Sequence, residues 1–94
     1  MGHFIVRIKV KGTVEESDVA AQKAFLGALT KEKRLVLAGT LPETPGQGMA
    51  IVRASTLDEA RALYSNAPLI KRDLIDWTIS ELNVTFGLAA LEAN

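Results

Sequence analysis

Few side chains in this sequence are suited to covalent or acid–base chemistry. The chain of 94 residues holds no cysteine and one histidine, His3. The lack of cysteine excludes disulfides, thiolate nucleophiles and cysteine-ligated zinc. Histidine as a residue type titrates near neutral pH, which makes His3 a candidate catalytic base or substrate anchor. One histidine cannot build a metal site, and no carboxylates at ligand spacing accompany it, so we expect no metal and no other cofactor.

Lys9 and Asp76 form the pair that we expect to transfer protons. The strands predicted below bring both side chains to one partly apolar surface, where an amine and a carboxylate can be tuned to act as acid and base. Arg7 points to the same surface, and its guanidinium could hold a phenolate or carboxylate through two parallel hydrogen bonds. The alternatives are an ordinary cross-strand salt bridge for the pair and a contact across a dimer interface for Arg7.

Three further polar residues are candidate substrate-binding groups. Gln22 lies on the apolar face of the first predicted helix, where a buried amide needs hydrogen-bond partners or solvent. Asn66 follows the second predicted helix and could orient a substrate oxygen, although asparagine at that place is commonly a helix cap. Thr40 is a candidate of the same kind. Tyr64 and Trp77 are interpreted as core or interface aromatics.

Four predicted strands must position these residues. Apolar and polar side chains alternate most clearly in the first and last of the strand segments, which are His3–Val10, Leu35–Leu41, Met49–Ala54 and Leu74–Val84. Pro68 opens a brief irregular or helical segment before the last strand. A tail of mostly small residues follows at Leu88–Ala93.

Two helices are predicted between the strands. Each begins at a capping box, in which the side chains of two residues satisfy the first free backbone amides, at Thr13 with Glu16 and at Thr56 with Glu59. The first helix runs to about Lys33, and the second is a short amphipathic helix of about three turns.

The order strand, helix, strand, strand, helix, strand predicts an α+β, ferredoxin-like sandwich with an antiparallel sheet and both helices on one face. Its last strand lies beside the first, which places Lys9 close to Asp76 and His3 near Ser80 or Leu82. The chain is expected to form one domain over residues 1–94, with a core at about 2–86 and a tail at 87–94. The face that carries Ile5 has no cover of its own, so we expect a homodimer that pairs these faces.

Composition limits the classes of partner. Eleven basic and eleven acidic residues give a formal net charge of zero, so the general attraction that basic proteins have for nucleic acids and anionic membranes is missing. No leader sequence or long apolar run is visible. We expect a cytoplasmic protein whose partner is a small molecule rather than a nucleic acid or a membrane.

Several segments together resemble the YCII-related family, in order and spacing from about Gly2 to Phe86. They are His3-Phe4-Ile5-Val6-Arg7, Ala24-Phe25-Leu26 with Leu29, Leu37-Ala38-Gly39-Thr40-Leu41, Gly48-Met49-Ala50-Ile51-Val52, Leu57-Asp58-Glu59-Ala60-Arg61-Ala62-Leu63 and Ala67-Pro68. The resemblance implies a dimeric ferredoxin-like fold. It also implies a catalytic histidine and aspartate at the positions of Gln22 and Ala67, where this chain holds neither.

The family has been linked to dehydrochlorination of chlorinated hydroxyhydroquinones, so the resemblance implies a lyase that acts on a small aromatic substrate by proton transfer. In that reading Lys9, Asp76 and His3 are catalytic, and Arg7, Asn66, Gln22 and Thr40 bind substrate. Two alternatives stay open. One is a non-catalytic dimeric binding module that lost the family's pair, and the other is an isomerase of a small aromatic-derived metabolite.

Overall fold

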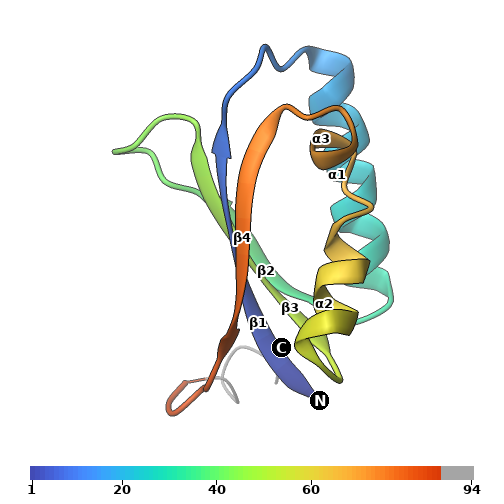
Figure 1. Cartoon of the computed structure of the whole chain (residues 1–94), viewed down its shortest axis with the longest axis vertical. Helices are drawn as coiled ribbons and strands as arrows, with labels where there is room; N and C mark the ends of the chain where they lie inside the picture. The colour runs from blue at the N-terminus through green and yellow to red at the C-terminus, as the bar shows by residue number, and fades with distance from the viewer. Residues whose placement is uncertain (88–94) are drawn as a thin grey trace.

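The computed structural model describes residues 1–87, which form a sheet with helices packed on one face (Figure 1). Within this range the elements are β1 Gly2–Val10, α1 Glu16–Lys31, β2 Leu35–Thr40, β3 Gln47–Ala54, α2 Leu57–Tyr64, α3 Pro68–Lys71 and β4 Ile75–Leu82. The predicted tail Leu88–Ala93 lies outside the described residues. None of the helices in residues 1–87 is long and apolar enough to cross a membrane.

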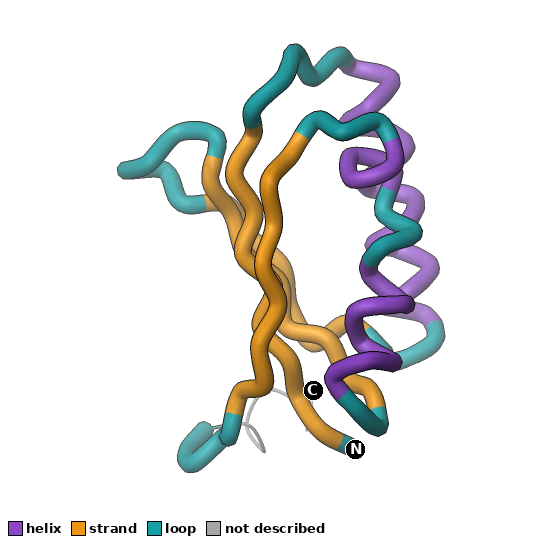
Figure 2. Tube along the Cα trace, in the orientation of Figure 1, coloured by secondary structure: helices purple, strands orange, loops and turns teal. Residues whose placement is uncertain are grey.

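The sheet is antiparallel, with the strand order β2-β3-β1-β4. Its first and last strands in sequence, β1 and β4, are neighbours, and their register opposes Lys9 to Asp76 and His3 to Leu82. Figure 2 shows the described helices stacked on one side of the sheet. The predicted ferredoxin-like α+β fold is therefore confirmed, together with the pairing of the first and last strands.

The alternation along β1 decides which face of the sheet is buried. Phe4 and Val6 are 3% and 0% exposed, whereas Arg7 and Lys9 are exposed. Successive side chains of a strand point to opposite faces, so the first two pack under the helices and the other two point away from them. The rest of this core comes from β3 and the helices: Ala50, Val52, Ala54, Ala60, Tyr64 and Ala67.

The start of α1 differs from the prediction. The capping box expected at Thr13 with Glu16 is wrong, because α1 begins at Glu16 and its N-cap is Glu15. Asp18 reaches back and accepts a hydrogen bond from the Glu15 N–H at 3.0 Å. The stretch before the helix stays tied to the start of β4 by two backbone bonds to the carbonyl of Leu74, at 3.0 and 3.3 Å. The N-cap of α1 therefore lies two residues, or about half a turn, after the predicted N-cap at Thr13.

The second helix begins as predicted. Thr56 is the N-cap of α2, and its hydroxyl accepts a hydrogen bond from the Glu59 N–H at 3.1 Å. Pro68 opens the short helix α3 at its first position, where the missing N–H of proline costs nothing.

The face of the sheet turned away from the helices carries apolar residues as well as charges. Ile5 lies opposite Ile51 of β3 and Ser80 of β4, and both isoleucines are only half-buried. Two residues further along β1 on the same face, Arg7 lies opposite Met49 of β3 and Thr78 of β4. None of the described helices covers this face, which we call the open face.

Candidate functional site

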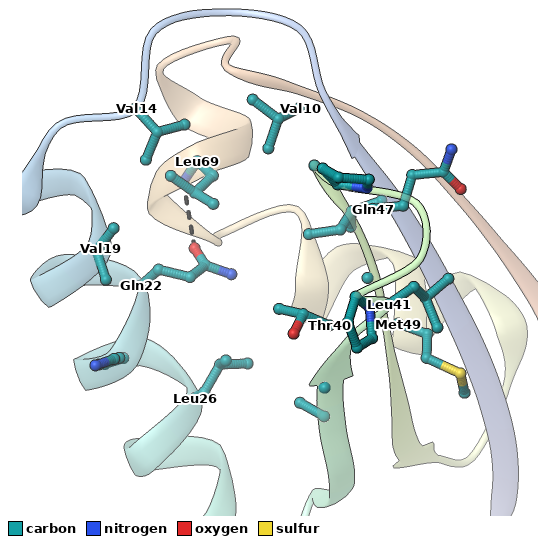
Figure 3. Close-up of a pocket in the computed structure, with 18 of the residues that line it drawn as sticks. Val10, Val14, Val19, Gln22, Leu26, Thr40, Leu41, Gln47, Met49 and Leu69 are labelled. Atoms are coloured by element: carbon teal, nitrogen blue, oxygen red, sulfur yellow. Dashed lines mark hydrogen bonds between the residues drawn. The ribbon is translucent and has the colours of Figure 1, made fainter.

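A cavity of about 660 Å³ lies on the helix side of the sheet, between α1, the start of α3 and the hairpin that joins β2 to β3 (Figure 3). Most of its wall is aliphatic and comes from β1, the segment before α1, α1 itself, the hairpin and α3: Ile8, Val10, Val14, Val19, Leu26, Leu41, Pro42, Pro45, Met49 and Leu69. A volume in this range matches typical small-molecule sites.

The β2–β3 hairpin forms one wall of this cavity, and a glycine lets its two strands lie close together. In Figure 1 the loop between β2 and β3 bends away from the helices, while α1 and α3 stay on the opposite side. Gly48 forms part of the cavity wall, and a Cβ added there would lie 2.8 Å from the carbonyl oxygen of Gly39 on β2. Only glycine permits this close approach of the two strands, so a larger residue would force the hairpin to shift.

Gln22 projects from α1 into this cavity with a defined orientation. Its Oε1 accepts a hydrogen bond from the backbone N–H of Leu69 at 3.3 Å, although the residue is only 8% exposed. A backbone N–H can only donate, so the atom facing it must be the amide oxygen. The amide nitrogen therefore points toward the interior of the cavity, as Figure 3 shows.

Tyr64 contributes a phenol to the same wall and is 2% exposed. Its ring packs edge-to-face with Phe25, at 5.7 Å between ring centroids, and lies tilted against the ring of Trp77 at 5.9 Å. Burial raises the pKa of the Tyr64 phenol, and a hydrogen bond with the Gln22 side chain lowers it in part. The phenol is therefore protonated at neutral pH and can donate a hydrogen bond.

Sequence reasoning treated Tyr64 as a packing residue and missed this role. One signal in the sequence points to more than packing. A tyrosine on the core face of a helix buries a hydroxyl, and a buried hydroxyl needs a hydrogen-bond partner. Gln22, on the core face of α1, has the same need. Two such residues on packed helices are candidates for one buried polar pair.

A buried carboxylate at the start of α1 forms an ion pair with the residue that follows α3. Asp18 is 4% exposed, and the Arg72 guanidinium after α3 donates to its carboxylate. The hydrogen bond from the Glu15 N–H, followed by the contact with Arg72, lowers the pKa of Asp18, and burial opposes the shift. Asp18 therefore joins the start of α1 to the segment that follows α3.

Lys9 and Asp76 lie on the open face and do not line the cavity. They are opposed in the register as predicted, but the Asp76 carboxylate forms an ion pair with Lys11 Nζ at 3.1 Å. The same ammonium lies 2.8 Å from Asp73, and these two carboxylates raise the pKa of Lys11. Arg7 is exposed on the open face as well. The candidates for proton transfer and the cavity thus occupy opposite sides of the sheet.

The remaining candidates are divided among different places. Thr40 lines the cavity from the hairpin, on the wall across from Gln22 (Figure 3). Asn66 is exposed and donates to the carbonyls of Ala62 and Leu63 at 3.2 and 3.5 Å, which is the helix-capping arrangement. His3 is opposite Leu82 near the other end of β1. Of the seven predicted site residues, the structure brings only Gln22 and Thr40 into the cavity.

Metal ligands do not come together in the described range. Within residues 1–87, no three histidine, aspartate or glutamate side chains lie close enough to hold a metal ion. The cavity wall, as described, contains two side chains that can ionise, Lys23 and Tyr64.

The fold is similar to that of two solved proteins. No family model matches the chain, and no curated protein matches it in sequence. The 5-chloro-2-hydroxyhydroquinone dehydrochlorinase from Burkholderia phenoliruptrix, solved in complex with 2,5-dihydroxybenzoquinone, matches with a TM-score of 0.68 and 19% identity, covering 86% of this chain and 93% of that chain. A conserved protein of unknown function from Bacteroides thetaiotaomicron, described as a possible oxidoreductase, matches with a TM-score of 0.56 and 14% identity, covering 85% of this chain and 93% of that chain. At these identities the likeness establishes a shared fold.

Proposed function

We propose that this chain is an enzyme that transfers protons on a small hydroxylated aromatic ring, most concretely a lyase that removes HCl from a chlorinated hydroxyhydroquinone. The observation that carries the proposal is the apolar cavity of about 660 Å³, into which the buried Gln22 amide points. Support also comes from the shared fold with a dehydrochlorinase solved with a quinone. We further propose, from the order of segments along the chain, that it belongs to the YCII-related family.

The proposed reaction needs no cofactor, because it balances within the substrate. One hydroxyl proton moves to the ring carbon that carries chlorine, a second is lost to solvent, and chloride leaves. Ring electrons form the two carbonyls of the hydroxyquinone product, so no external oxidant is consumed. The protein must hold the ring, stabilise charge on its oxygens and exchange one proton.

The cavity offers groups for each of these tasks. Its aliphatic wall suits the ring, and Gln22 can donate to a ring oxygen. Tyr64 and Lys23 are the side chains in the described wall that can hold and release a proton. The competing proposal is that Lys9 and Asp76 do this chemistry on the open face, with His3 as a further base and Arg7 as a substrate anchor.

Chloride release from 5-chloro-2-hydroxyhydroquinone by the purified protein tests the proposal and separates the two faces. We expect Tyr64→Phe and Lys23→Met to lower kcat/KM by about 100-fold or more, since positioned acids and bases contribute at least this much. Lys31→Met is the matched control, because Lys31 is an exposed lysine in the last turn of the same helix.

Each result of this assay has a defined meaning. Loss of activity in Lys9→Ala and Asp76→Asn, with Tyr64→Phe and Lys23→Met unaffected, would move the chemistry to the open face. A product with the mass of the substrate would indicate an isomerase. No turnover of any hydroquinone by the wild-type protein would contradict the enzymatic proposal.

One observation favours a second function, a non-catalytic ligand-binding module. The described cavity wall contains no histidine and no carboxylate, and the family's pair is replaced by Gln22 and by Ala67, which is fully buried. Such a module would show no turnover, while a hydroquinone would still raise the melting temperature through binding to the folded state.

A further inference from the structure

We infer that the cavity binds a hydroxylated aromatic ring that carries an aliphatic substituent. The ring lies beside the Gln22 amide, and the substituent fills the valine end of the cavity. The valine end is the part of the wall formed by Val10, Val14 and Val19. This inference rests on the proposed aromatic ligand and adds the chemical class of the group attached to its ring.

The cavity is larger than the ring proposed for it. Its volume is about 660 Å³. An apolar cavity of about 150 Å³ is enough to hold benzene, so one ring with its hydroxyls and chlorine takes up less than half of this space. Wall atoms that face an unfilled space lose their van der Waals contacts. A ligand that extends beyond the ring by several carbons therefore fits this cavity better than the ring alone.

The position of Gln22 on α1 separates a buried polar part of the wall from an aliphatic part. Gln22 is 8% exposed, and its Oε1 is held by the Leu69 N–H at 3.3 Å. Val19 lies one turn earlier on α1, or about 4.5 Å closer to the start of the helix. Figure 3 shows Val10 and Val14 on this side of Gln22 as well. A substituent on a ring at the Gln22 amide can therefore reach the valine end directly.

The side chains of the valine end consist of carbon alone, so they favour an aliphatic substituent over a polar one. A polar group buried among them without a hydrogen-bond partner would lose affinity. The other polar side chains of the wall lie elsewhere. Thr40 is across the cavity from Gln22, and the Gln47 amide points away from the valines (Figure 3). Lys23 is exposed and follows Gln22 on α1, away from the valine end.

Two large apolar residues of the wall are exposed to water. Val19 on α1 is 42% exposed, and Leu41 on the hairpin is 41% exposed. They line the cavity from two different elements, so a substituent between α1 and the hairpin covers apolar surface on both. Removal of this surface from water favours binding in proportion to the area covered.

Calorimetric titration of the purified protein with 4-ethylresorcinol, 4-butylresorcinol and 4-hexylresorcinol tests the inference. These probes share one hydroxylated ring and differ only in the length of the alkyl chain. A buried methylene tightens binding by about threefold to fourfold. We therefore expect 4-hexylresorcinol to bind at least about 30-fold more tightly than 4-ethylresorcinol, with 4-butylresorcinol between them.

A double variant assigns this gain to the valine end. Val14→Thr combined with Val19→Thr keeps the shape of both side chains and replaces a methyl of each with a hydroxyl. It should reduce the ratio of the ethyl to the hexyl Kd by about fivefold or more. The control is Val36→Thr, because Val36 is a half-buried valine of β2 outside the cavity wall, and it should leave the ratio unchanged.

A second measurement on the wild-type protein does not depend on the variants. Nuclear Overhauser contacts should join the hexyl chain to the methyl groups of Val10, Val14 and Val19, and the ring protons to the side-chain amide of Gln22. Far-UV circular dichroism shows whether the double variant folds. If it does not fold, the Overhauser contacts decide.

Three results would overturn the inference. The first is 4-hexylresorcinol that binds no more than about threefold more tightly than 4-ethylresorcinol, or not at all at millimolar concentration. The second is an unchanged ratio in the folded double variant. The third is a hexyl chain whose contacts lie outside the valine end.

The proposed reaction fails separately, because these probes carry no chlorine. Tighter binding of the longer chains without chloride release from any chlorinated hydroxyhydroquinone leaves the inference standing and contradicts only the dehydrochlorinase. Chloride release from 5-chloro-2-hydroxyhydroquinone without a gain from the chain contradicts only the inference.

Discussion

Asp18 is a carboxylate in an almost fully buried position, 4% exposed, at the start of α1. The Glu15 N–H and Arg72 stabilise its charged form, so its folded-state pKa lies below the ordinary value of 3.8. Folding therefore favours loss of its proton. The resulting contribution to stability is fully present above about pH 4 and is lost as the pH falls through the folded-state pKa.

We predict that Asp18→Asn lowers stability at neutral pH and weakens its dependence on pH in acid. Asparagine can still accept from the Glu15 N–H, but it carries no charge for Arg72 and does not titrate. Urea unfolding midpoints measured between about pH 5 and pH 2 check this. Asp58→Asn is the control, since that side chain is 97% exposed. If the unfolding midpoints of the wild type and of Asp18→Asn changed equally with pH, the role given to Asp18 would be contradicted.

Two residues of the cavity differ in how well sequence could identify them. Gln22 was predicted as a ligand-binding group because a glutamine at a helical core position breaks the apolar stripe. Tyr64 continues the apolar stripe of its own helix, α2, so its position in the sequence gives no sign of a function other than packing. Its significance depends on Gln22 and Leu69, which come from other elements.

The two longer helices, α1 and α2, begin at different kinds of cap. Thr56 caps α2 through its hydroxyl, whereas Thr13 was predicted as a cap and lies before the N-cap of α1. We predict that Thr56→Ala destabilises the protein by about 1 kcal/mol and that Thr13→Ala changes stability by less than about 0.5 kcal/mol. Chemical denaturation of both variants measures the difference. Equal losses in the two variants would show that the predicted cap at Thr13 contributes after all.

The difference between these starts has a physical cause. A capping box is a pattern in four residues, and α2 begins where this pattern places it, with Thr56 as the N-cap. At Thr13 the pattern is equally good, but the backbone just before it is bound to the carbonyl of Leu74, the residue before β4. A contact more than sixty residues away along the chain therefore decides where α1 begins, and no local pattern contains that information.

The open face of the sheet predicts a homodimer. We propose that two copies pair through Ile5, Ile51 and their neighbours, because half-buried apolar residues on a sheet without cover gain by burial against a second copy. Ile51→Lys places a charge in the middle of this surface and should shift the protein from dimer to monomer. Light scattering coupled to size exclusion measures the mass.

The control for this experiment is Ala28→Lys, which adds the same side chain at an exposed position on α1. It should leave the mass unchanged. A wild-type protein that stays monomeric at high concentration would contradict the proposed dimer.

Local patterns in the sequence determined the sheet, the order of its strands and the face that the helices cover. Alternation along a strand and the spacing of apolar residues along a helix each report which side is buried, and short connections leave few ways to join these elements. The antiparallel pairing of β1 with β4 followed from the same reasoning, and the register opposes Lys9 to Asp76 as expected.

Only the tertiary structure decided where a ligand could bind and which charges meet. The cavity exists because the β2–β3 hairpin bends away from α1 and α3, and no single segment encodes a gap between three others. Asp76 pairs with Lys11 rather than with Lys9, because the path of the chain after β1 brings the later lysine to the turn before β4. Distances between side chains on separate elements arise from packing, so they become known only when the elements are assembled.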